Sequence, residues 1–132
     1  MAADERPARA RRRVLWMVVF ALALVGQLAV LYSPVTTGDI DIPFGDKVVH
    51  AIIFAVPAFA GVLGGLRPWA VAALLVAHSI ASESIQHFFL ADRMGDWGDA
   101  VADVVGVAIG LALALALQRR SRRRDAPSRP RR

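Results

Sequence analysis

Charged and imidazole side chains stand at helical spacing inside stretches of sequence that are otherwise apolar. Asp46 and His50 are four positions apart, so a helix would place them on one face. Glu83 shares a face in the same way with Gln86 and His87, three and four positions later. A charged side chain inside a membrane costs about 2.5–3.5 kcal/mol or more unless it has a partner. These residues therefore predict a polar pocket between helices.

A second polar stripe joins acidic residues to glycines. Intervals of four, three and four place a set of residues on one side of a helix, and here that set is Asp99, Asp103, Gly106 and Gly110. The two glycines form a G-x-x-x-G pattern, which allows a neighbouring helix to approach closely. Asp103 lies on this close-packed side, so we expect it to face the interior of a helix bundle.

The side chains of the predicted pocket suit recognition of an anionic group. Lys47 and Arg93 would bind the anionic oxygens. Glu83 and Asp103 would orient the bound group, and His50 would transfer protons or complete the hydrogen-bond network. One alternative is an enzyme that uses His50 and Glu83 as acid and base. Another is a structural subunit in which the same ion pairs only fix helix register. The sequence assigns no catalytic residue and leans against an enzyme.

The spacing gives little support to other kinds of site. His50, His87, Glu83 and Asp103 are metal-ligand types, but no H-E-x-x-H or H-x-x-x-H pattern joins them, so neither a metal nor a cofactor is expected. Ser79, four positions before Glu83, is a weak candidate nucleophile. The chain has no cysteine, which excludes disulfides and thiolate chemistry. Its arginine-rich ends lack interleaved aromatic residues, so nucleic acid is not an expected partner.

The composition predicts that these residues lie in a membrane. Of the 132 residues, 56% are hydrophobic, which is more than a small soluble domain can bury. The apolar residues gather in four stretches, 14–32, 46–66, 69–90 and 100–117, each close to the roughly 20 residues that span a bilayer. A secretory signal peptide is the alternative for the first stretch, but no A-x-A-like cleavage site follows it. We expect an all-α integral membrane bundle of four transmembrane helices over residues 14–117.

The distribution of charge predicts an orientation. Residues 1–13 and 118–132 are rich in arginine, and we expect both to be disordered basic tails. The stretch 33–45 has no Lys or Arg, and 91–99 has only Arg93 beside three aspartates. Because positive residues stay on the cytoplasmic side, both termini should be cytoplasmic, which an even number of spans also requires. The protein is then a multi-pass protein of the cytoplasmic membrane whose polar pocket opens outward.

The order and spacing of these motifs resemble the VanZ-like family of small bacterial membrane proteins. The motifs that carry the resemblance are D-K-V-V-H at 46–50, E-x-x-Q at Glu83 and Gln86, Arg93, and D-x-x-x-D-x-x-G-x-x-x-G from Asp99 to Gly110. The resemblance covers about residues 14–117. Asp103 stands where the family usually has Asn, and the segment between Gln86 and Arg93 lacks the Pro-Gly often seen there.

The resemblance implies a cell-envelope protein of a family linked to resistance to the glycopeptide antibiotic teicoplanin, with no established activity. The residues carried over as a ligand-binding set are Asp46, Lys47, His50, Glu83, Gln86, Arg93, Asp99 and Asp103, with Gly106 and Gly110 as helix-packing residues. The expected function is binding of an envelope lipid or a lipid-linked head group. Expected partners are membrane lipids, a lipid-linked envelope precursor or another membrane protein.

Overall fold

Four long helices make up the part of the chain that the structure describes. The computed structural model describes residues 5–32, 45–89 and 97–124, and within these ranges it contains no strand. The helices are α1 (Glu5–Tyr32), α2 (Gly45–Leu63), α3 (Pro68–Phe89) and α4 (Trp97–Arg124). Each is long and apolar enough to cross a membrane. The expected all-α, four-helix membrane architecture is therefore confirmed.

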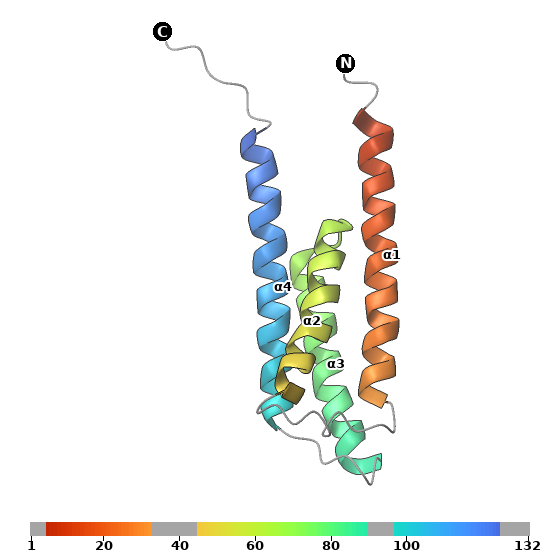
Figure 1. Cartoon of the computed structure of the whole chain (residues 1–132), viewed down its shortest axis with the longest axis vertical. Helices are drawn as coiled ribbons and strands as arrows, with labels where there is room; N and C mark the ends of the chain where they lie inside the picture. Colours follow the sequence, from red (N-terminus) through yellow and green to blue (C-terminus); the bar gives the residue numbers. More distant parts are fainter. Residues whose placement is uncertain (1–4, 33–44, 90–96, 125–132) are drawn as a thin grey trace.

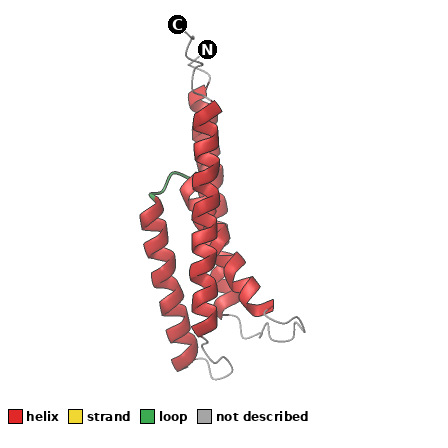
Figure 2. Cartoon of the chain, turned by 90° about the vertical axis from the view of Figure 1, so that its left-hand side faces the viewer, coloured by secondary structure: helices red, strands yellow, loops and turns green. Residues whose placement is uncertain are grey.

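Successive helices run in opposite directions, so the start of α1 and the end of α4 lie at the same end of the bundle (Figure 1). The helix α2 packs against the other three helices, and most extensively against α4. From the turn that joins them, α2 and α3 diverge toward the opposite end (Figure 2). The chemistry-bearing residues of α2, α3 and α4 lie toward that opposite, splayed end.

A short turn between α2 and α3 explains where both helices end. Gly65 has a φ of 101°, a left-handed conformation that favours glycine. The Leu66 N–H donates to the Gly61 carbonyl at 3.0 Å, which closes α2 with a glycine C-cap. Pro68 then opens α3 at the first helical position, where its missing N–H costs nothing. The turn lies at the junction of the apolar stretches 46–66 and 69–90 of the sequence.

The helices α1 and α4 extend beyond the apolar stretches 14–32 and 100–117 of the sequence. The helix α1 begins at Glu5 and α4 continues to Arg124, so the expectation of disordered tails is wrong for residues 5–13 and 118–124. Alanine and arginine favour helix, and adding residues to an existing helix costs little. Arginines in the last turn of α4 also complement its dipole. The rest of each predicted tail lies outside the described residues.

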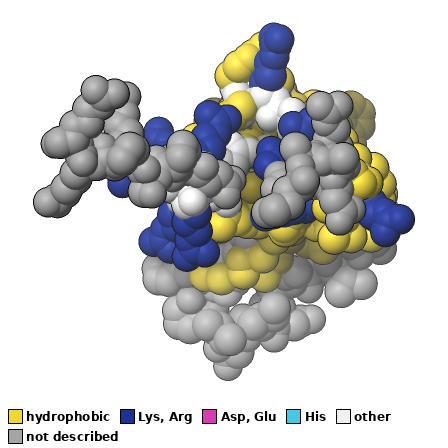
Figure 3. Space-filling view, turned by 90° about the horizontal axis from the view of Figure 1, so that it is seen from above, with side chains coloured by type: hydrophobic (Ala, Val, Ile, Leu, Met, Phe, Trp, Pro, Cys, Tyr) yellow, Lys and Arg dark blue, Asp and Glu magenta, His cyan; other side chains and the backbone are white. Residues whose placement is uncertain are grey.

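The helical extensions form a basic end. They project beyond the α2–α3 turn (Figure 1), and among the described residues the charged side chains in view from this end are those of Lys or Arg (Figure 3). The exposed arginines of the two extensions are Arg9, Arg11, Arg12 and Arg13 of α1, and Arg119, Arg120, Arg122, Arg123 and Arg124 of α4. The positive charge that the sequence places at this end is therefore carried by helices over residues 5–13 and 118–124.

The surface and the interior are divided as in a membrane bundle. Large apolar side chains face outward, such as Leu22 at 65% exposure, Ile80 at 62% and Leu113 at 56%. Polar side chains, Ser79 and Asp103 among them, are buried. A lipid solvent favours this arrangement because apolar surface costs nothing there, whereas polar groups need partners within the bundle.

The contact between α2 and α4 is a direct backbone approach at two glycines. A Cβ atom added at Gly106 would lie 2.8 Å from the carbonyl carbon of Ala51 and would overlap its oxygen. At Gly110 it would overlap the Ala55 carbonyl and lie 2.8 Å from the Ala58 Cβ. The G-x-x-x-G pattern therefore sits in a helix seam that only glycine permits. This seam holds the preceding turn of α4 close to α2.

Candidate functional site

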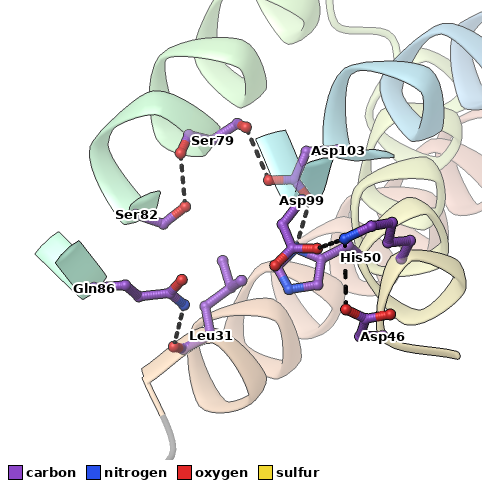
Figure 4. Close-up of polar contacts among 9 residues, drawn as sticks. Leu31, Asp46, His50, Ser79, Ser82, Gln86, Asp99 and Asp103 are labelled. Atoms are coloured by element: carbon purple, nitrogen blue, oxygen red, sulfur yellow. Dashed lines mark hydrogen bonds and ion pairs between the residues drawn. The ribbon is translucent and has the colours of Figure 1, made fainter. Parts of the chain in front are cut away.

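Three buried side chains from three helices form what we call the polar centre: His50 of α2, Ser79 of α3 and Asp103 of α4. The Ser79 hydroxyl donates to Asp103 Oδ2 at 2.8 Å, and His50 Nδ1 lies 2.9 Å from Asp103 Oδ1 (Figure 4). The side chain of Asp103 is fully buried. Both of its carboxylate oxygens therefore have a partner, as a carboxylate inside a membrane bundle requires.

Glu83 adds a second carboxylate to the polar centre. It lies one turn after Ser79 on α3 and so shares its face. Ligand atoms of Glu83, His50 and Asp103 all lie within 4.8 Å of one another. Both carboxylate oxygens of Glu83 are buried, although the residue as a whole is half-buried. The structure thus brings together Glu83, His50 and Asp103 as sequence spacing predicted, although 53 positions separate His50 from Asp103.

A group of ion pairs lies one turn nearer the splayed end. Lys47 Nζ is 3.1 Å from Asp99 Oδ1 and 3.6 Å from Asp46 Oδ2 (Figure 4). The Lys47 side chain is 30% exposed and that of Asp46 is 45% exposed. Pairs this exposed contribute only about 0–1 kcal/mol to stability. Their main effect is to place charge beside the polar centre.

A hollow of about 440 Å³ opens between the end of α3 and the start of α4. It is lined by Ile80, Glu83, Ser84, His87, Phe88, Trp97 and Ala100. We call it the α3–α4 groove. Mostly apolar walls with a few polar groups are typical of small-molecule sites. Because Glu83 belongs both to the groove and to the cluster around Asp103, it connects the lipid-facing surface with the buried polar centre.

One predicted pocket residue is placed differently, and another lies outside the described residues. The Gln86 side-chain amide is buried and donates to the Leu31 carbonyl at 2.8 Å (Figure 4). Leu31 lies in the last turn of α1, where backbone carbonyls lack a partner within the helix, so this bond ties α3 to α1. Arg93 lies outside the described residues, and its role in binding an anion stays a prediction.

The sequence missed two contributions to the site. Ser79 had been considered only as a weak nucleophile, yet its hydroxyl supports Asp103. The signal was present, because Ser79 is four positions before Glu83. Trp97 and Ala100 line the groove without any polar atom that would single them out in a sequence.

Comparison of the chain with models of protein families, with curated proteins and with solved structures gives no match. The likeness to VanZ-like proteins therefore rests on the motifs alone. The geometry of the chain itself defines the site. It consists of a buried His–Asp–Ser centre, an adjoining glutamate and a groove that reaches this glutamate.

Proposed function

We propose that this protein is a VanZ-like component of the bacterial cell envelope that binds an envelope lipid or a lipid-linked head group in the α3–α4 groove. One observation carries the proposal. The groove leads from the apolar surface to Glu83, whose carboxylate lies within 4.8 Å of His50 and Asp103. A ligand in the groove would therefore contact both apolar side chains and an ionisable cluster.

The groove suits a molecule that has a hydrocarbon chain and a polar head. Ile80, Phe88 and Trp97 offer apolar surface for the chain. Glu83 and His87 offer hydrogen-bonding groups for the head. A phospholipid or a polyprenyl-linked phosphate combines these features, and the positive charge that its phosphate needs would come from Lys47 and Arg93.

An outward opening of the groove belongs to the same proposal. The arginines of α1 and α4 gather at the end of the bundle opposite the Lys47–Asp99 pair. Positive residues are retained on the cytoplasmic side, so this distribution supports cytoplasmic termini and a groove at the external face.

The orientation can be tested with two positions on a single helix. The chain has no cysteine, so single cysteines can be introduced without background. Trp97→Cys, at the start of α4, should react with a membrane-impermeant maleimide added to intact cells. Arg120→Cys, near the end of α4, should react only after the membrane is permeabilised. The opposite labelling pattern would place the groove on the cytoplasmic side.

Lipid binding can be tested by native mass spectrometry of the purified protein offered membrane lipids and polyprenyl phosphates. Wild type should retain one head-group class. Glu83→Gln should lose it, and so should Ala100→Trp, which fills the groove. Ala108→Trp, at an exposed alanine two turns further along α4, is the matched control and should retain it. Equal retention by Ala100→Trp and wild type would contradict the proposal.

The His50–Asp103 pair favours a second candidate function. An aspartate bonded to Nδ1 of a histidine orients the ring for proton transfer through its other nitrogen, as in many acid–base catalysts. An enzyme acting on a lipid-linked phosphate would reveal itself in the same experiment by changing the mass of the bound lipid. If no lipid class is retained and every variant of the groove only melts earlier, the polar centre serves helix packing alone.

A further inference from the structure

One imidazole and two carboxylates meet at the inner end of the α3–α4 groove, and lipid binding does not require this combination. We propose that His50, Glu83 and Asp103 form a binding site for one divalent transition-metal ion such as Zn²⁺. The inference goes beyond the proposed function and does not rest on it, because the three ligands lie within the bundle and can be tested without lipid.

The distances fit shared coordination. Two ligand atoms that bind one Zn²⁺ at about 2.1 Å in tetrahedral geometry lie about 3.4 Å apart. His50 Nδ1 and Asp103 Oδ1 are 2.9 Å apart. All three ligand atoms lie within 4.8 Å of one another, so side-chain rotations that bring them to about 3.4 Å would complete a three-ligand set.

The types of ligand select the class of ion. An imidazole nitrogen with two carboxylate oxygens is a set that Zn²⁺, Fe²⁺ and Mn²⁺ accept. Mg²⁺ and Ca²⁺ prefer oxygen ligands throughout, so His50 disfavours them. The ion would also offset the repulsion between two carboxylates that lie side by side in an apolar surrounding.

The surroundings of the cluster support a built site. The Ser79 hydroxyl holds Oδ2 of Asp103 and leaves Oδ1 directed toward His50 (Figure 4). Hydrogen bonds of this kind orient metal ligands and tune their affinity. The Lys47 ammonium lies one turn away, where it pairs with Asp99 and Asp46. The α3–α4 groove, which reaches Glu83, gives an ion a route from the surface.

Sequence spacing gives little support to a metal at this site, because its ligands come from three helices. Metal motifs are recognised when two ligands stand a few residues apart on one element. Here the ligands are His50 on α2, Glu83 on α3 and Asp103 on α4. The expectation that no metal is bound rested on the absence of such local spacing.

The test is a zinc titration of the chelator-stripped protein in detergent without lipid, with the bound metal counted by elemental analysis. Wild type should bind one Zn²⁺ per chain in the presence of excess Mg²⁺. Loss of an orienting partner alone weakens metal binding about 10–100-fold, so loss of a ligand in Glu83→Gln or Asp103→Asn should weaken it by more than about 100-fold. Ser79→Ala should fall within the about 10–100-fold range.

His87→Asn is the matched control, because His87 lines the groove beside Glu83 but lies outside the cluster. It should bind Zn²⁺ as wild type does. Thermal melts show which variants remain folded, and Zn²⁺ should raise the melting temperature of wild type but not of Glu83→Gln. Undiminished zinc binding in folded Glu83→Gln, or its loss in His87→Asn, would overturn the site. Lipid retention measured with chelator present would show separately whether the groove proposal stands.

Discussion

Replacing Gly106 with alanine is expected to destabilise the bundle by about 3 kcal/mol, the upper part of the range for overpacking. The added methyl group would overlap the backbone oxygen of Ala51 and lie 2.8 Å from its carbonyl carbon. Backbone atoms of α2 cannot rotate away as a side chain can. The two helices must therefore separate, and the distance between His50 and Asp103 must grow with them.

Gly26→Ala is the control for this prediction. It adds the same methyl group in the middle of a helix, but no atom lies within 4 Å of the position that its Cβ would occupy. Alanine favours helix over glycine by about 1 kcal/mol, so this variant should be as stable as wild type or more stable. Denaturation of both proteins in mixed micelles gives the comparison. Equal stability of Gly106→Ala and Gly26→Ala would show that α2 and α4 do not meet as described.

The second large effect is expected at Asp103. Its replacement by alanine removes the acceptor of Ser79 and the partner of His50 while both remain buried. Removing one partner of a buried polar set costs about 3–5 kcal/mol. Asp103→Asn keeps a carbonyl oxygen and an amide of similar shape, so it should lose much less. The order of unfolding free energies should be wild type, then Asn, then Ala.

Asp99→Ala serves as the reference for this series. Asp99 lies one turn earlier on α4, where it pairs with Lys47 near the bundle surface. This pair is partly buried, with the Asp99 side chain 16% exposed and the Lys47 side chain 30% exposed, so its loss should cost less than loss of the fully buried Asp103. Equal losses of unfolding free energy in Asp99→Ala and Asp103→Ala would mean that the burial of Asp103 in the polar centre adds nothing to stability, which would contradict the prediction.

The helices could be predicted because hydropathy is a local property. Four apolar stretches gave four helices, and Pro57 does not interrupt the second of them. The spacing of Asp103, Gly106 and Gly110 likewise indicated a close-packed face. Helical periodicity determines which residues share a side of one helix, and it needs no knowledge of the other helices.

The sequence does not show which helix contacts each face of its neighbour. Gln86 shares a face with Glu83 and was expected in the same pocket, yet it bonds to Leu31 of α1. Ser79 was undervalued because its importance depends on Asp103 of another helix. The α3–α4 groove is lined by residues of two helices, and how the ends of these helices pack is not written in either one alone. Residues 5–13 and 118–124 are helical although their charge predicts disorder, because alanine and arginine favour helix.

The most direct test of the central claim is photo-crosslinking from inside the α3–α4 groove in living cells. A photoreactive amino acid replaces Ala100, which lines the groove, or Leu113, which is 56% exposed on the same helix. Lipids attached to the purified proteins are then identified by mass spectrometry. The account predicts that one head-group class is enriched at position 100 relative to position 113. Identical lipid profiles at the two positions would mean that the groove holds only bulk lipid, and the proposed function would be contradicted.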